Sequence, residues 1–228
     1  MLEPAARMAR SCVASVVPEP WLQRVRAYRR SDLFRREGVV FVHVPKAAGT
    51  SICQALYGRL LGHFSLADVM SACPAEVQAL PRFSVARNPW DRLVSAWSYH
   101  VAATTKGGRI DDRAGRSRQA GGPECEAFER FVNESLAVGD VHELGGIFRP
   151  QSAYLLDSHL QASFDHLGRL ETLSETEFWL SDTLGRTVSI ARSNTTRHAH
   201  YKTYYTPQMR NLVGDIYAQD LALLGYDF

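Results

Sequence analysis

An apolar run at residues 39–44 ends abruptly in a turn of small residues at 45–49. Thr50 and Ser51 follow this turn and open a segment whose apolar residues have helical spacing as far as about Leu61. This order predicts a buried strand, a tight loop and the first turn of a helix. Because such a loop directs backbone N–H groups and a helix N-terminus toward one point, it favours a bound phosphate or sulfate.

The loop carries a lysine in a chain whose basic residues are almost all arginines. Of the 26 basic residues only three are lysines: Lys46, Lys106 and Lys202. A lysine ammonium is a compact point charge on a flexible stem, whereas arginine presents a rigid fork. Lys46 therefore suggests a need for a mobile, hydrogen-bonding charge beside the bound anion.

Strand and helix patterns alternate along the chain. Further strands are predicted at 83–87 and 166–170, and each is followed by a predicted helix, the first opened by Asn88 and Pro89. The helices are predicted at 20–37, 50–61, 89–101, 124–138, 150–160, 174–185 and 207–224. The alternation predicts an α/β fold, P-loop-like and three-layered, with a central parallel sheet and helices on both faces.

The chain of 228 residues is long enough to bury one full core, so we expect one main domain. Residues 1–37 are predicted to be an N-terminal extension that ends in the basic helix, and residues 38–228 to be the domain. Five glycines among mixed charges at 104–123 predict a mobile loop within this domain.

Composition and net charge exclude several classes of binding partner for this chain. The net charge of +2 is too small to indicate nucleic acid as the main partner, and no apolar run approaches the ~20 residues that span a bilayer. The four cysteines show no CxxC pair and no metal-ligand spacing, which is typical of free thiols in a reducing compartment. We expect a cytoplasmic protein without a metal site. The arginines of the 20–37 helix indicate a solvated face, or else contact with an acidic substrate or a membrane surface.

The first loop differs from the nucleoside-triphosphate motif GxxxxGK[ST]. That motif places its lysine directly after the last glycine, where this chain has Thr50, and Lys46 precedes the turn instead. No apolar strand ends in an acidic residue suited to Mg²⁺. The loop is therefore predicted to bind an anion without a metal, which disfavours a P-loop nucleotide kinase.

A second anion site is predicted after the second strand. Arg87 ends this strand, and Ser95 follows about two helical turns later. In a parallel sheet both loops open at the same edge, at the carboxyl ends of the strands. Two anion sites at one edge imply a ligand with two separated anionic groups.

Both segments resemble the donor-binding motifs of sulfotransferases. VPKAAGTS at 44–51 resembles their 5′-phosphosulfate loop, and VARNPWDRLVSAW at 85–97 resembles their 3′-phosphate motif, usually RxPxxRxxSxY. The closest resemblance is to carbohydrate sulfotransferases of the heparan 2-O and chondroitin 4-O type and their bacterial relatives. It continues through 149–151, 168–173 and 194–228.

The resemblance implies 3′-phosphoadenosine 5′-phosphosulfate (PAPS) as donor and 3′-phosphoadenosine 5′-phosphate (PAP) as product. The sulfuryl group would pass to a hydroxyl acceptor, a glycan in the closest group, by in-line displacement. Lys46 suits the stabilising cation. The residues implied to hold the donor are Lys46, Ala47, Ala48, Gly49, Thr50, Ser51, Arg87 and Ser95. Asn194 and Arg197 lie in an irregular segment that either closes over the nucleotide or forms a plain surface loop.

His63 is the predicted base, because Gly62-His63-Phe64 stands where the 2-O group has a short Gly-His stretch. The alternative role is a helix-end histidine that bonds carbonyls. Other candidate bases are His100, His142, Glu124, Glu126 and Glu129. Relatives often have His-Trp before the proline–glutamine element, where this chain has Ile147 and Phe148, and this difference suggests a different acceptor. A nucleotide-binding module without catalysis is the third function considered.

Overall fold

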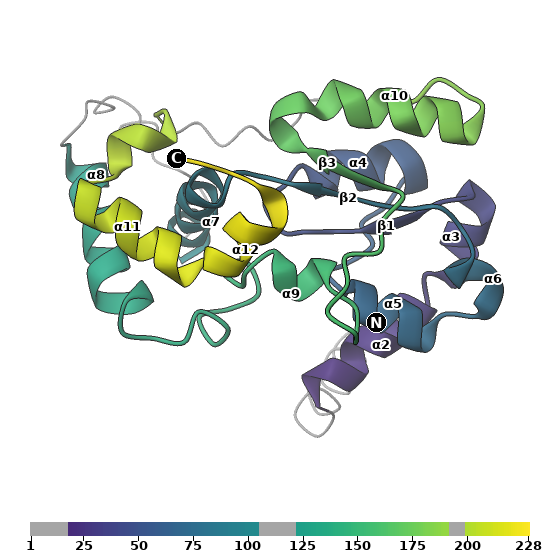
Figure 1. Cartoon of the computed structure of the whole chain (residues 1–228), viewed down its shortest axis with the longest axis horizontal. Helices are drawn as coiled ribbons and strands as arrows, with labels where there is room; N and C mark the ends of the chain where they lie inside the picture. Colours follow the sequence, from purple (N-terminus) through teal and green to yellow (C-terminus); the bar gives the residue numbers. More distant parts are fainter. Residues whose placement is uncertain (1–17, 105–121, 192–198) are drawn as a thin grey trace, which may run out of the picture.

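The computed structural model describes residues 18–104, 122–191 and 199–228. Over these residues it contains a three-stranded sheet with both neighbouring pairs parallel. The strands, in sheet order, are β1 (Val40–Val42), β2 (Arg82–Ala86) and β3 (His166–Arg169). Figure 1 shows α10 above the sheet and α5 and α9 below it. The predicted α/β class and parallel sheet are confirmed.

The strands are embedded among helices of very different lengths. In chain order these are α2 (Glu19–Tyr28), α3 (Ser31–Glu37), α4 (Gly49–Tyr57), α5 (Leu66–Ala72), α6 (Ala75–Gln78), α7 (Pro89–Thr104), α8 (Pro123–Phe131), the π-helical turn η2 (Val132–Leu136), α9 (Ser152–Leu155), the 3₁₀ turn η3 (Leu170–Thr172), α10 (Leu173–Leu184), the 3₁₀ turn η4 (Tyr201–Tyr204), α11 (Pro207–Ile216) and α12 (Ala218–Leu224). None of these described helices has both the length and the apolar character needed to cross a membrane.

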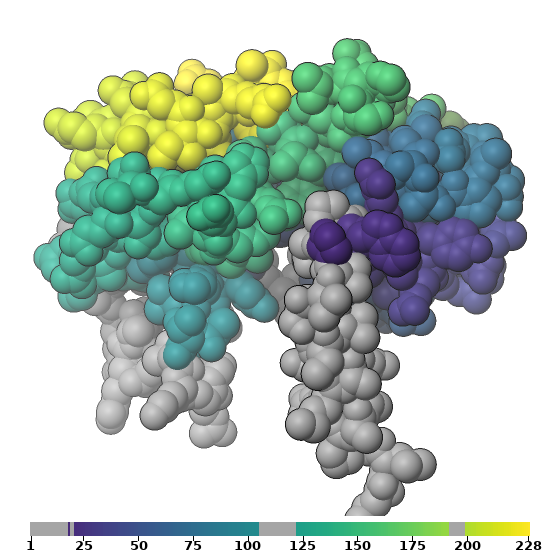
Figure 2. Space-filling view, turned by 90° about the horizontal axis from the view of Figure 1, so that it is seen from below, coloured from purple at the N-terminus to yellow at the C-terminus, as the bar shows by residue number. Residues whose placement is uncertain are grey.

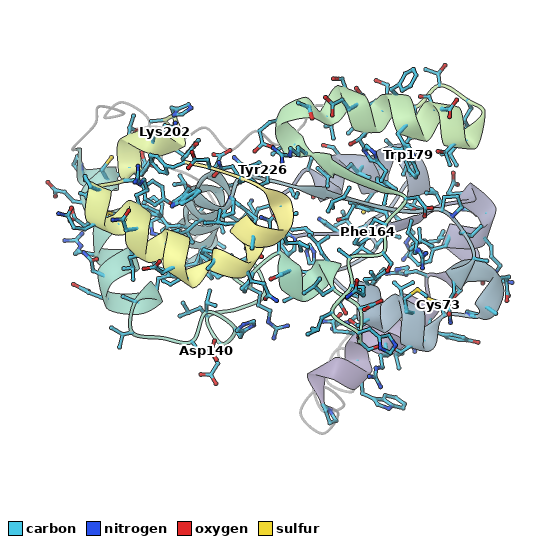
Figure 3. The ribbon with its side chains drawn as sticks, in the orientation of Figure 1. Cys73, Asp140, Phe164, Trp179, Lys202 and Tyr226 are labelled. Atoms are coloured by element: carbon cyan, nitrogen blue, oxygen red, sulfur yellow. The ribbon has the colours of Figure 1, made fainter. Side chains whose placement is uncertain are left out.

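Two hydrophobic clusters make up the core of the described residues. The first surrounds the sheet and buries β1 completely. Trp179 projects from α10 toward the sheet (Figure 3), and its ring stacks on His166 with the centroids 5.0 Å apart. The second cluster lies among α7, α8 and α11 and contains Trp90 and Trp97. Both tryptophans are therefore buried core residues.

The basic N-terminal segment forms two helices, α2 and α3, so the prediction of one helix at 20–37 is wrong. The chain turns at Arg29 and Arg30, and Ala27 and Phe34, one from each helix, are both fully buried. Both residues belong to the hydrophobic cluster around the sheet. α2 packs on α5, and Figure 2 shows the purple N-terminal helices beside the blue segment that contains α5.

Three other predicted elements are shorter in the structure. β1 covers only part of 39–44, because the chain leaves the sheet at His43 to enter the loop. α4 ends before Leu61, because Gly58 adopts a left-handed φ of 63° that stops the helix. α9 covers only four residues of the helix predicted at 150–160. The chain turns at Asp157, whose carboxylate accepts two backbone N–H groups.

The helix predicted at 207–224 is divided into α11 and α12 at Tyr217. The Tyr217 hydroxyl donates to the carbonyl of Phe148 at 2.7 Å, inside the second cluster. This contact fixes the residue at which the two helices meet.

Two sequence predictions fall on residues outside the described ranges. The mobile loop predicted at 104–123 lies almost wholly within 105–121. Asn194 and Arg197 lie within 192–198. Neither prediction is tested by the structure.

Candidate active site

The loop between β1 and α4 has an unusual backbone. Lys46 and Ala48 have positive φ values of 69° and 59°, a left-handed conformation that is unfavourable for residues other than glycine. Ala48 is the N-cap of α4 and provides no side-chain oxygen for the N–H groups of the first turn. The first turn therefore offers these N–H groups and the positive end of the helix to an anion.

The imidazole of His43 lies directly against Gly49. A Cβ atom on Gly49 would lie 1.8 Å from both Cδ2 and Nε2 of this ring. His43 is buried, and its ring centroid is 4.1 Å from that of His63. Only glycine fits at this position, because the enclosed ring has little room to move aside.

Gly49→Ala is expected to lower the free energy of unfolding by about 1–3 kcal/mol, the usual cost of overpacking a buried site. Urea denaturation measures this loss. In the His43→Ala background, which removes the ring, the same substitution is expected to cost clearly less. Equal costs in the two backgrounds would contradict the close approach of His43 to Gly49.

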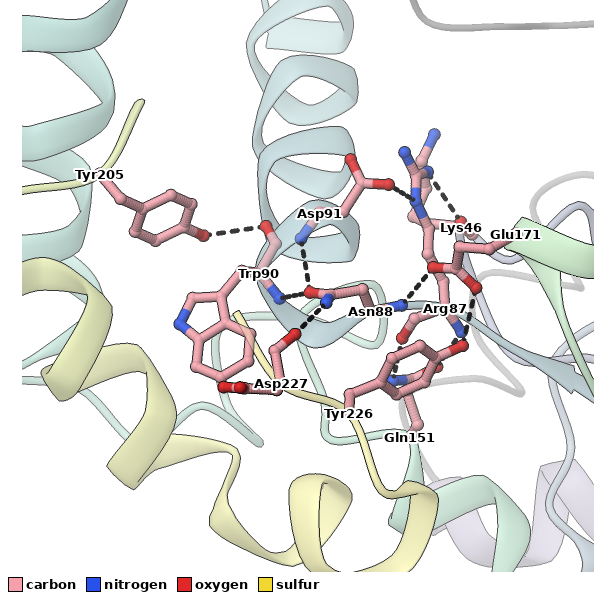
Figure 4. Close-up of polar contacts among 10 residues, drawn as sticks. All are labelled: Lys46, Arg87, Asn88, Trp90, Asp91, Gln151, Glu171, Tyr205, Tyr226 and Asp227. Carbon is pink, nitrogen blue, oxygen red and sulfur yellow. Dashed lines mark hydrogen bonds and ion pairs between the residues drawn. The ribbon is translucent and has the colours of Figure 1, made fainter. Parts of the chain in front are cut away.

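Arg87, directly after β2, is held by three neighbours. Its backbone N–H donates to Oε1 of Gln151 at 3.0 Å, and its carbonyl accepts from Nε2 of Gln151 at 2.8 Å. Its side chain donates from Nε to Asp91 at 2.8 Å and from Nη1 to the carbonyl of Lys46 at 3.2 Å (Figure 4). The last hydrogen bond joins the second motif to the first loop.

Gln151 is in turn held by α12. The backbone N–H groups of Gln151 and Ser152 donate to the two oxygens of Asp220 at 2.7 and 2.8 Å. The Asp220 carboxylate is fully buried. These hydrogen bonds fix the start of α9. They thereby also position the side-chain amide of Gln151, which bonds the backbone of Arg87.

Asn88 fixes the start of α7. Its Oδ1 accepts from the N–H of Trp90 at 3.0 Å, and its Nδ2 donates to the carbonyl of Asp227 at 2.8 Å. Its own N–H donates to Glu171 at 2.9 Å, and the same carboxylate accepts from the hydroxyl of Tyr226 at 2.8 Å (Figure 4). Residues distant in sequence therefore hold the second motif in place.

Arg92 has a structural role. It is only 2 % exposed, and its guanidinium donates to the carbonyls of Pro45, Ile147 and Arg149. The neighbouring Asp91 pairs with Arg87. Within the described ranges, Arg92 has no carboxylate partner.

Both motifs open into one cavity of about 860 Å³. The predicted site residues that line it are Lys46, Ala48, Gly49, Thr50, Ser51, His63, Arg87 and Ser95. Ala47 does not line the cavity: it is buried in the core around the sheet, and its N–H donates to the carbonyl of Val44. Ala191 and Ala199, the described residues on either side of 192–198, both line the cavity.

Lys46 lies at the edge of this cavity against an aromatic ring. Its Nζ is 4.4 Å from the centroid of Tyr99, a cation–π contact. Burial, and secondly the charge of Arg87, lowers the pKa of Lys46 to about 8. An anion in the cavity would favour the charged form of the lysine.

His63 is accessible from the cavity. Its Nδ1 lies 3.3 Å from the carbonyl oxygen of His43. A proton on Nδ1 donates to this carbonyl and leaves Nε2 with a lone pair. Burial lowers the pKa of His63, and the hydrogen bond to His43 partly opposes this effect. The imidazole is therefore neutral near pH 7, the form that a base requires.

The other predicted candidate bases do not line the cavity; these are His100, His142, Glu124, Glu126 and Glu129. Among described residues, two carboxylates do line it, Asp91 and Glu171, and both already accept hydrogen bonds. His43 and His200 also line it. Burial, and secondly the charge of His63, lowers the pKa of His43 to about 3, which makes it a poor base. His200 is exposed and was not considered from the sequence.

A model of the sulfotransferase family matches residues 29–227. The chain belongs to the sulfotransferase family. No curated protein and no solved structure matches it at a significant level. The family match begins within the segment predicted as an N-terminal extension, nine residues before position 38.

Besides His200, sequence reasoning missed four residues that line or support this candidate site: Asp91, Tyr99, Gln151 and Glu171. Asp91 lies four residues after Arg87, and Tyr99 lies four residues after Ser95, a helical spacing that places side chains on one face and was available as a signal. Gln151 and Glu171 lie in segments that resemble the family. Their roles depend on contacts across the fold, which no local pattern indicates.

Proposed function

We propose that this protein transfers the sulfuryl group of PAPS to a hydroxyl of a carbohydrate acceptor. The observation that carries the proposal is that the two predicted anion sites line one cavity: the loop at 44–51, and Arg87 with Ser95. PAPS carries a 5′-phosphosulfate and a 3′-phosphate, separated groups of the kind that these two sites suit. Family membership supports sulfuryl transfer, and the paired sites support this donor.

The residues present suit the two ends of the donor. The strand–loop–helix at 40–57 would act as a P-loop-like cradle for the 5′-phosphosulfate, because the first turn of α4 lacks a side-chain cap. Arg87 and Ser95 would hold the 3′-phosphate. Asn194 and Arg197 stay candidate donor contacts, because both described neighbours of their segment line the cavity. A mechanism without a metal is part of the proposal.

The chemistry is divided among a few side chains. When bound, the donor supplies a sulfuryl group whose bond to the phosphate oxygen breaks as the acceptor oxygen attacks in line. Nε2 of His63 accepts the hydroxyl proton. The ammonium of Lys46 and the first-turn N–H groups of α4 stabilise the negative charge that develops. Arg87 fixes the far end of the nucleotide, which keeps the reacting atoms aligned.

PAP is expected to stabilise the protein far more than ATP–Mg²⁺ does. A ligand at 100 times its Kd raises the free energy of unfolding by about 2.7 kcal/mol. Thermal denaturation with equal concentrations of the two nucleotides measures the difference. Stabilisation by ATP–Mg²⁺ alone would contradict the proposal and favour the kinase alternative. Release of PAP from PAPS in the presence of an acceptor distinguishes the enzyme from a non-catalytic binding module.

Arg87→Gln is expected to weaken PAP binding about 10- to 100-fold, because a hydrogen bond to a charged group contributes about 1.5–3 kcal/mol. Calorimetric titration with PAP measures the loss. Arg35→Gln, an exposed arginine paired with Asp32 outside the cavity, is the control and should bind PAP normally. Normal affinity in Arg87→Gln would refute the two-site model.

A further inference from the structure

A second cavity of about 700 Å³ adjoins the first. Four residues line both: Leu60, Gly62, His63 and Ile147. The proposed base therefore lies at the junction between the two cavities. If the donor occupies the first cavity, an acceptor that reaches Nε2 of His63 has the second cavity available. Its volume is in the range of known small-molecule sites.

The second cavity is lined by cations and by no described carboxylate. Arg26 comes from α2, Arg30 from the turn between α2 and α3, and Arg149 from the segment before α9. Nε of Arg30 donates to the carbonyl of Leu61 at 3.0 Å, and Nε of Arg149 donates to the carbonyl of His142 at 3.3 Å. Both guanidinium groups are thus anchored by backbone oxygens, which hold them in position without cancelling their charge.

Neither Arg30 nor Arg149 has a carboxylate partner in the part of the chain that the structure describes. Burial lowers the pKa of Arg30, and Arg59 and Arg29 lower it further by repulsion. Crowded positive charge of this kind is relieved by a bound anion. A solvated face, the interpretation favoured from the sequence, does not explain why these arginines line a cavity next to His63.

We propose that the second cavity is the acceptor site and that Arg30 and Arg149, with Arg26, select an acidic carbohydrate by binding its carboxylate. This inference rests on the proposed function. Arginine suits the role because its planar fork forms paired hydrogen bonds with a carboxylate. Arg26 lies before the family match at 29–227, so part of this site is built by a segment outside that match. The acceptor hydroxyl next to the carboxylate would then face His63.

The test compares a glucuronic-acid-containing tetrasaccharide with its carboxyl-reduced counterpart, using PAPS as donor. Arg30→Gln and Arg149→Gln are each expected to raise the acceptor KM at least 10-fold for the acidic sugar. Both should leave the Kd for PAP unchanged. Arg24→Gln, an exposed arginine on α2 that lines neither cavity, is the matched control and should behave as wild type. Two separate variants are used, so that misfolding of one does not prevent the test.

Binding of the same tetrasaccharide to the PAP complex, measured by calorimetry, provides a readout independent of turnover. Binding by wild type that is lost in Arg149→Gln supports the acceptor site. Equal use of the acidic and reduced sugars, no binding of the acidic sugar, or unchanged KM in both variants would overturn it. If the proposed function itself is wrong, PAP will not stabilise the wild-type protein. This result distinguishes failure of the proposed function from failure of the acceptor site alone.

Discussion

Lys46→Ala is expected to lower kcat about 10²- to 10³-fold, while the Kd for PAP changes much less. Removing one preformed donor to developing negative charge has this effect on the rate. A catalytic charge stabilises the transition state more than the ground state, so the loss is expected in kcat and much less in the Kd for PAP. Single-turnover kinetics and PAP titration separate the two quantities.

The pH dependence gives an independent check on Lys46. Lys46 must carry its charge to stabilise the transferring group. Burial, and secondly the charge of Arg87, lowers the pKa of Lys46 to about 8 in the free enzyme. kcat/KM for the donor should therefore fall as pH rises through about 8, and this limb should be absent in Lys46→Ala. Lys202→Ala, at an exposed lysine outside the cavity, is the control. An unchanged kcat in Lys46→Ala would remove the lysine from the mechanism.

His63→Ala is expected to lower kcat about 10²- to 10⁴-fold and to preserve stabilisation by PAP, because a general base acts on the acceptor. The imidazole of His63 must be neutral to accept a proton. The rate of sulfuryl transfer should therefore fall as pH drops through the pKa of His63. Burial lowers this pKa, so the acid limb should lie below the ordinary value for histidine. A pH–rate profile of kcat/KM for the acceptor measures it.

His200→Ala is the matched comparison, since His200 is an exposed histidine that also lines the cavity. It is expected to keep most of the activity and the same acid limb. Full activity in His63→Ala with loss in His200→Ala would transfer the role of base to His200.

The parts of the site that depend on local sequence could be predicted. The apolar strand and the small-residue turn indicated the anion loop, and the order of Arg87 and Ser95 indicated a second site at the same sheet edge. Parallel pairing of β1 with β2 explains why this worked, because it brings both loops to one edge. Seven predicted site residues from these two motifs line one cavity for this reason.

What could not be predicted depends on tertiary contacts. Nothing in the residues around Arg30 predicts a helix break, because Ala27 and Phe34 are seven positions apart and one continuous helix would also place them on one buried face. The backbone clamp of Gln151 on Arg87 joins residues 64 positions apart. The helix predicted at 150–160 is wrong for the same reason. Its apolar residues suit a long helix as well as they suit the short α9 and the turn after it, and packing in the folded protein selects the second arrangement.

The hydrogen bonds that α12 and the residues after it form with the second motif and with Gln151 also set the order in which the site is assembled. Asn88 bonds Asp227, which is 139 positions later, and Asp220 holds Gln151. During synthesis the loop at 44–51 and Arg87 leave the ribosome long before these partners exist. The edge proposed to bind the nucleotide is therefore complete only after residues 220–227 have docked. Until then a nucleotide is expected to add little stability to the nascent chain, and folding relies first on the cluster around the sheet, because the second cluster also needs residues 204–217.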